Sequence, residues 1–162
     1  NQGPKGGVMK VSKFIHLHGT IVLTVNPDFT LVETARKFAQ PVGGRKLSLA
    51  VVCDDTEQVI GVVSLGDMNY ALARHGEKAA KMLARDVMNT EVATCAPDDN
   101  VEDVLQSMAK KGIRHMPVVE NGKLAGLLSR RDALEFLYHQ ASLDVESLSD
   151  WLFVSEARYC RF

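Results

Sequence analysis

The stretch Gly126-Leu127-Leu128-Ser129-Arg130-Arg131-Asp132 decides the fold, because an equivalent stretch occurs 65 residues earlier as Gly61-Val62-Val63-Ser64-Leu65-Gly66-Asp67. Both read Gly-h-h-Ser-x-x-Asp, where h is an apolar residue. Upstream of each, Thr24-Val25-Asn26-Pro27-Asp28 corresponds to Thr94-Cys95-Ala96-Pro97-Asp98. The chain therefore contains an internal repeat. Two copies are too few for a solenoid, so we expect two halves of one compact unit.

The composition is typical of a globular protein. The chain has 162 residues, of which 46% are apolar and 24% charged, and a formal net charge of −1. No global field therefore attracts nucleic acid or a membrane surface, and no apolar run is long enough to span a bilayer. Three scattered cysteines fit a reducing compartment, which predicts a cytoplasmic location. Residues 1–9 are interpreted as a flexible leader or an expression remnant.

Each copy is expected to form strand, helix, strand, strand, helix. In copy two, Val101, Val104, Leu105 and Met108 have the spacing of one buried helical face, which Gly112 ends. Asn121-Gly122 predicts a type I′ turn between two strands. In copy one, Thr30 and Glu33 predict a capping box, with Asn100 and Asp103 as the analogue in copy two. The buried positions expected in copy one are Leu31, Ala35 and Phe38, with Gly43 or Gly44 as the helix stop.

The fold predicted from these elements is mixed α+β, with two β-α-β-β-α copies packed around a pseudo-twofold axis, because half the chain is too short for a separate core. Copy one covers residues 10–80 and copy two residues 81–140. Residues 141–162 form a tail in which Leu143, Leu148, Trp151 and Leu152 could make an amphipathic helix.

The two Gly-h-h-Ser-x-x-Asp segments carry the chemistry. Each places a hydroxyl and a carboxylate at the start of a helix, where free N–H groups favour a phosphate. A carboxylate there could accept from both hydroxyls of a ribose. Ser and Asp before a helix are also ordinary capping residues, but their occurrence at the same place in both copies favours nucleotide binding.

With these motifs and His115-Met116-Pro117-Val118-Val119, the chain resembles a tandem pair of CBS domains over roughly residues 10–140. The resemblance implies a stand-alone regulatory module that binds AMP, ADP, ATP, NAD or S-adenosylmethionine. It further implies a homodimer and an effector protein on another chain.

Carried over by position, Asp132 and Asp67 would hold ribose hydroxyls, and Ser129 and Ser64 would face phosphate or ribose. Thr94 and Thr24 would line the adenine side, together with Ile113 and Met116. Arg114, His115, Arg130 and Arg131 would bind phosphate in copy two, although solvated surface arginines are an alternative. At the aligned positions copy one has Ser48, Leu65 and Gly66, and it has Ala50 where copy two has Pro117.

Other sites are not supported. His16 and His18 would share one face of a strand, but no third metal ligand lies near them in the sequence. No phosphate-binding Gly-x4-Gly-Lys loop and no catalytic serine or Cys/His motif occurs, so no catalytic residue or cofactor is assigned. The alternatives to a regulatory module are a dimerisation module without ligand and a nucleotide-hydrolysing enzyme. The enzyme is disfavoured because no Mg²⁺-binding carboxylate cluster accompanies Asp67 and Asp132.

Overall fold

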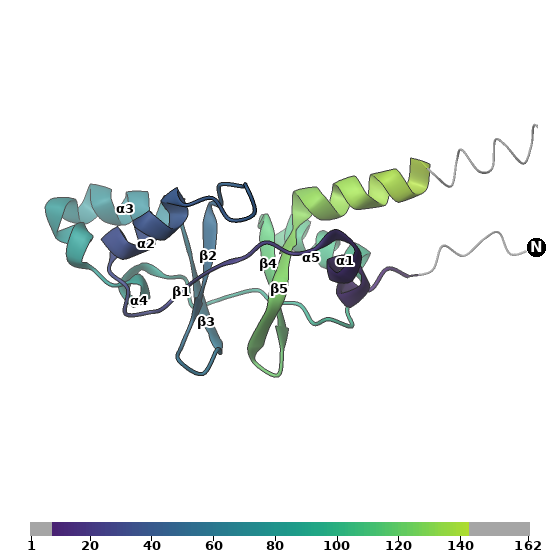
Figure 1. Cartoon of the computed structure of the whole chain (residues 1–162), viewed down its shortest axis with the longest axis horizontal. Coiled ribbons are helices and arrows are strands. Elements are labelled where there is room, and N and C mark those ends of the chain that lie inside the picture. Colours follow the sequence, from purple (N-terminus) through teal and green to yellow (C-terminus); the bar gives the residue numbers. More distant parts are fainter. Residues whose placement is uncertain (1–7, 143–162) are drawn as a thin grey trace, which may run out of the picture.

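A computed structural model gives the structure of the protein, and it describes residues 8–142. The chain forms a mixed α+β fold in which both hairpins stand side by side in the centre with helices around them (Figure 1). Copy one contains β1 (Leu23–Val25), α2 (Leu31–Ala39), β2 (Leu49–Cys53), β3 (Val59–Ser64) and α3 (Leu65–His75). The 3₁₀ helix η1 (Gly76–Lys81) follows α3, and α4 (Ala84–Val87) leads into copy two. Copy two contains α5 (Val101–Lys111), β4 (His115–Glu120), β5 (Lys123–Ser129) and a helix from residue 130 to the described end at 142. The helix α1 (Val11–His18) leads into copy one.

The two sheets follow the predicted order, with one difference. In copy one, β1 pairs in parallel with β2, and β2 pairs with β3 as a hairpin. In copy two, β4 and β5 form the hairpin, while the expected first strand is reduced to a single parallel bridge between Cys95 and Val118. The type I′ turn is confirmed, because Asn121 and Gly122 have φ angles of 52° and 80°.

Helix starts and stops were predicted with partial success. The capping box is confirmed, since the Thr30 hydroxyl accepts from the Glu33 N–H and the Glu33 carboxylate accepts from the Thr30 N–H. Its proposed analogue is wrong, because the Asn100 side chain accepts from Glu102 and not from Asp103. Gly112 ends α5 in the left-handed conformation, as expected.

Three details of copy one and the leader differ from prediction. In α2 the buried residue between Leu31 and Phe38 is Thr34, whereas Ala35 is exposed. The helix α2 ends at Ala39, just before Pro41, because proline cannot continue a helix. Gly43 and Gly44 instead form a separate tight turn. His16 and His18 lie on α1, so the strand predicted for them is wrong. The tail positions Leu143, Leu148, Trp151 and Leu152 lie outside the described residues.

Each copy packs against the leading helix of the other copy. Val11 and Phe14 of α1 are buried with Val101 and Met108 of copy two. Ala84 of α4 is buried in the core of copy one.

The backbone contacts repeat this exchange. In copy two, Val11 and Ser12 donate to the carbonyls of Asp99 and Pro97. In copy one, Ala84 and Arg85 donate in the same way to the carbonyls of Phe29 and Pro27. The two halves are therefore related by pseudo-twofold contacts and share their cores.

Candidate functional site

The hairpin register determines which side chains face the site. Leu49 pairs with Ser64 in copy one, and His115 pairs with Ser129 in copy two. The structural equivalent of Pro117 is therefore Val51. The predicted alignment of Pro117 with Ala50 is wrong by one residue. Because side chains alternate along a strand, this shift reverses the face. Ala50 is fully buried in the core and Met116 points away from His115 and Pro117.

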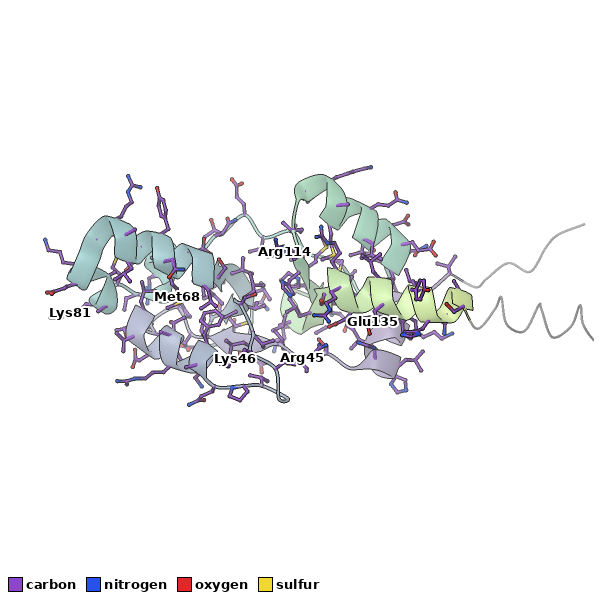
Figure 2. The ribbon with its side chains drawn as sticks, turned by 90° about the horizontal axis from the view of Figure 1, so that it is seen from above. Arg45, Lys46, Met68, Lys81, Arg114 and Glu135 are labelled. Atoms are coloured by element: carbon purple, nitrogen blue, oxygen red, sulfur yellow. The ribbon has the colours of Figure 1, made fainter. Side chains whose placement is uncertain are left out.

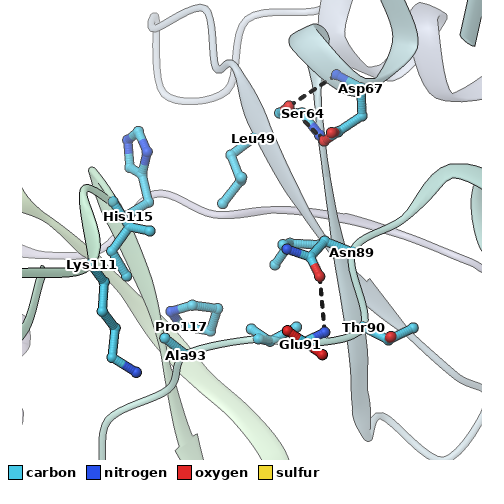
Figure 3. A pocket seen from close by; sticks show the side chains of 13 residues that line it. Leu49, Ser64, Asp67, Asn89, Thr90, Glu91, Ala93, Lys111, His115 and Pro117 are labelled. Carbon is cyan, nitrogen blue, oxygen red and sulfur yellow. Dashed lines mark hydrogen bonds between the residues drawn. The ribbon is translucent and has the colours of Figure 1, made fainter. Parts of the chain in front are cut away.

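A cavity of about 720 Å³ lies beside the first motif (Figure 3), and we call it the Asp67 pocket. It combines residues from β2, β3 and the start of α3 with residues 89–93, which precede α5, and with the entry to β4. Its lining residues are Leu49, Val62, Ser64, Asp67, Asn89, Thr90, Glu91, Val92, Ala93, Lys111, Ile113, His115 and Pro117.

A second cavity of about 470 Å³ lies beside the second motif, and we call it the Asp132 pocket. It combines β5 and the start of the helix at 130–142 with the segment before β1 and the loop before β2. Its lining residues are Phe14, His18, Gly19, Thr20, Ile21, Arg45, Lys46, Leu47, His115, Leu127, Ser129, Arg131 and Asp132. Each pocket is thus a composite of both copies, and the two pockets are pseudo-twofold equivalents.

Close approach of these pre-strand segments explains the glycine of each motif. A methyl group at Gly61 would lie 2.6 Å from the Met88 sulfur and 3.1 Å from the Asn89 carbonyl oxygen. A methyl group at Gly126 would lie 2.9 Å from the end of the Ile15 side chain and 3.3 Å from the side chain of the pocket-lining Thr20. The two glycines therefore make room for chain segments that line the pockets.

The two carboxylates have different partners. Asp67 closes a capping box, in which its carboxylate accepts from the Ser64 N–H at 2.7 Å and the Ser64 hydroxyl at 2.6 Å. Asp132 accepts instead from both terminal nitrogens of Arg45, at 3.0 and 3.3 Å. Arg45 comes from copy one, so this bidentate ion pair joins the copies inside the Asp132 pocket. The hydrogen bonds to Asp132 raise the pKa of the Arg45 guanidinium above its ordinary value.

Charge differs between the pockets as well. The Asp132 pocket gathers Arg45, Lys46 and Arg131 around one carboxylate. The Asp67 pocket has Lys111 as a cation and carries a second carboxylate, Glu91. The excess of positive charge around Asp132 suits an anionic ligand.

His115 contributes to the lining of both pockets. It is half-buried, and burial lowers the pKa of its imidazole, with Asp132 acting in the opposite direction and Arg114 in the same one. A half-buried neutral imidazole can donate at one nitrogen and accept at the other. His115 is therefore a polar group that a ligand in either pocket could contact.

The structure separates some of the residues that were predicted to act together. Ser64, Asp67, Ile113, His115 and Pro117 line the Asp67 pocket, and His115, Ser129, Arg131 and Asp132 line the Asp132 pocket. Arg114 and Arg130 lie in a neighbouring cavity of about 470 Å³ that shares His115, Ser129 and Arg131 with the Asp132 pocket. Thr94 and Met116 line a smaller cavity of about 260 Å³ between α5 and β4. Thr24 and Ser48 are exposed outside both pockets, and Ala50 is in the core.

Sequence reasoning missed the segments that precede the first strand of each copy. Thr20 and Ile21 line the Asp132 pocket, while Asn89 and Thr90 line the Asp67 pocket. The 70-residue spacing that relates Pro27 to Pro97 also relates Thr20 to Thr90, so extending the alignment of the copies backwards would have found them.

Within residues 8–142, no group of three or more metal-ligating side chains is present. No helix in that range is long and apolar enough to cross a membrane.

Comparison with known proteins gives a consistent result. The CBS domain model matches residues 17–74 and 84–139. An uncharacterized protein of Methanopyrus kandleri is 30% identical over 115 residues, which cover 70% of this chain and 57% of that protein. A CBS-domain-containing protein of Agrobacterium tumefaciens has a TM-score of 0.68 and 27% identity, covering 83% of this chain and 98% of its own. A CBS domain protein of Pyrobaculum aerophilum, complexed with AMP, has a TM-score of 0.64 and 26% identity, covering 76% and 89%.

Proposed function

The chain belongs to the CBS domain family, and from that premise we propose that it binds an adenine nucleotide in its two composite pockets and thereby regulates a partner protein. The observation that carries the proposal is the repeated arrangement of a Ser/Asp pair at a helix start beside a cavity built from both copies. The AMP bound by the Pyrobaculum aerophilum relative supports the ligand class. AMP is the first candidate, with ADP, ATP, NAD and S-adenosylmethionine as the others.

Each part of such a ligand has a suitable partner. The carboxylate of Asp67 or Asp132 can accept from the ribose hydroxyls, and the first turn of the following helix offers N–H groups to a phosphate. Apolar side chains in the lining of each pocket suit the adenine ring. These are Val62 and Ile113 in the Asp67 pocket and Ile21 and Leu47 in the Asp132 pocket.

Regulation would follow from the composite construction of the pockets. A ligand that contacts both copies binds one relative arrangement of the copies better than another, and so shifts the population towards it. The shift is limited by the difference in affinity between the two arrangements. In this proposal the chain is not an enzyme, it acts in the cytoplasm, and the effector is a separate protein rather than nucleic acid or membrane.

We further propose that the module forms a homodimer. Leu65 and Leu72 of α3, and Leu134 and Tyr138 of the helix at 130–142, are 42–72% exposed. The two helices lie along the same side of the molecule (Figure 1). Their spacings, i to i+7 and i to i+4, place each pair on one helical face. A second copy related by a twofold axis would cover equal patches on both chains.

The proposal is tested by identifying what the protein carries and what it binds. Small molecules released by denaturing the purified protein are analysed by mass spectrometry, and AMP, ADP, ATP, NAD and S-adenosylmethionine are titrated by calorimetry. We expect Asp132→Ala to weaken binding at least about tenfold, because charged hydrogen bonds are lost. Asp28→Ala, at an exposed position outside both pockets, is the control. A folded protein that binds none of the five ligands would instead be a structural module.

A further inference from the structure

The loop that carries Arg45 has no counterpart in copy two. Val42 and Arg45 exchange backbone hydrogen bonds of 2.9 and 3.0 Å around Gly43 and Gly44. Those glycines have φ angles of 57° and 77°, the geometry of a type I′ turn. The turn lies against Ile21 of the Asp132 pocket, since a methyl group at Gly43 would lie 3.0 Å from the Ile21 side chain. Arg45 is thereby presented to the opposite copy by a well-defined turn.

Arg45 binds the Asp132 carboxylate, which is the group that a ribose would use. Its guanidinium takes both oxygens of Asp132, as a planar fork of donors matches a carboxylate. The Asp132 side chain is 16% exposed and that of Arg45 is 51% exposed. Because the Arg45 side chain is about half exposed, a ligand that enters the pocket can reach the pair and compete for both of its partners. Figure 2 shows Arg45 where copy one meets the helix that carries Glu135.

We propose that Arg45 makes the Asp132 pocket selective for phosphorylated ligands by exchanging Asp132 for a ligand phosphate. This inference rests on the proposed nucleotide function. When ribose hydroxyls take the carboxylate, the guanidinium must leave it. A phosphorylated ligand brings a new anionic partner into the same pocket, whereas a neutral nucleoside brings none. Adenosine therefore breaks the Arg45–Asp132 pair without giving the guanidinium a new anionic partner.

The Asp67 pocket provides the internal comparison. Its carboxylate is held by Ser64 of its own helix start, and its lining contains no arginine. A ribose there needs no guanidinium to move. We therefore expect the Asp67 pocket to discriminate less between adenosine and AMP than the Asp132 pocket, which should prefer AMP and ATP over adenosine.

The test measures both pockets separately in one protein. Adenosine, AMP and ATP are titrated into ¹⁵N-labelled wild type and Arg45→Gln, and amide shifts are followed at Gly19–Ile21 for the Asp132 pocket and at Asn89–Ala93 for the Asp67 pocket. In Arg45→Gln we expect tighter adenosine binding and weaker ATP binding in the Asp132 pocket, which lowers its preference for ATP by about tenfold or more. The Asp67 pocket should keep its ratio. Arg36→Gln, which removes an exposed charge from α2, is the matched control and should leave both ratios unchanged.

The outcomes separate this inference from the proposed function. Nucleotide binding with an unchanged adenosine-to-ATP ratio in Arg45→Gln would overturn the inference alone. An equal loss for adenosine and ATP would do the same, because Arg45 would then be a general contact. If Arg36→Gln changed the ratio as much as Arg45→Gln, the preference for phosphorylated ligands would come from net charge, and the inference would also be overturned. If no ligand perturbs either pocket of the wild type, the proposed function fails as well.

Discussion

The hydroxyl of Thr20 both donates to the carbonyl of Leu127, at 3.1 Å, and accepts from its N–H, at 2.9 Å. One side chain thus forms hydrogen bonds with both backbone groups of Leu127, on the edge of β5. In copy one the same task is done by backbone, since Asn89 and Val62 exchange two hydrogen bonds. The segment that lines each pocket is therefore fastened to the motif strand of the other copy.

Thr20→Val should destabilise the protein by about 1–3 kcal/mol, because it leaves the N–H and carbonyl of the mostly buried Leu127 without partners. Urea unfolding measures the change. Thr20→Ser keeps the hydroxyl and should recover most of the loss, and Thr24→Val at an exposed strand position is the matched control. Equal stability of Thr20→Val and wild type would show that the two hydrogen bonds contribute nothing.

Gly61→Ala should cost more stability than Gly126→Ala. The methyl at position 61 meets the backbone carbonyl of Asn89 as well as Met88, whereas at position 126 it meets only side-chain atoms of Ile15 and Thr20. Overpacking that cannot relax costs about 1–3 kcal/mol. Thermal unfolding of the two variants compares them directly. A larger loss for Gly126→Ala would contradict the backbone argument.

Protonation of His115 should lower stability in mild acid. Burial lowers the pKa of its imidazole in the folded state below the ordinary value of 6.5, so below that pH the unfolded chain binds more protons. The free energy of unfolding should therefore be highest above about pH 6.5 and fall as the pH drops towards the folded pKa. Urea unfolding between about pH 5.5 and 8 measures this, above the range in which the carboxylates titrate.

Copy one has a leucine, Leu49, at the position equivalent to His115. The variant His115→Leu removes the imidazole and should flatten this pH dependence. His16→Gln on the exposed surface of α1 should retain it. A slope that persists in His115→Leu would mean that another group is responsible.

Leu134→Glu should dissociate the proposed homodimer by burying a charge at its interface. Sedimentation velocity measures the mass in solution, and the matched variant Leu17→Glu, 56% exposed on α1, should leave the dimer intact. A monomeric wild type, or equal dissociation by Leu17→Glu, would remove the dimer from the proposal.

Local signals predicted the elements well, because they depend on neighbouring residues. The capping box at Thr30, the turn at Asn121-Gly122 and the buried face of α5 were all readable from spacing. Pocket composition was not, because it depends on how the copies pair. Thr94 is expected in the pocket of its own copy, but it lines a separate small cavity, because each pocket is built from the strand ends of one copy and the leading segment of the other.

Register and insertion caused the other errors. Ala50 was aligned with Pro117 by residue pattern, but the sheet pairing moves it by one position and into the core. Arg45 was overlooked because it lies in a loop that copy two lacks, and an inserted residue has no internal counterpart to call attention to it. Alternating histidines suggested a strand at His16 and His18, where the amphipathic pattern of Val11 and Phe14 produces a helix.

The exchange of leading helices between the copies determines which pieces of this protein can be recombined with those of relatives. A hybrid that replaces residues 94–142 alone would keep an α1 whose Val11 and Phe14 pack in the discarded core. Such a hybrid leaves α1 packed against a core that it does not fit. A hybrid that transfers α1 together with copy two keeps this packing intact. A hybrid should therefore take α1 with copy two and α4 with copy one, rather than an uninterrupted stretch of sequence.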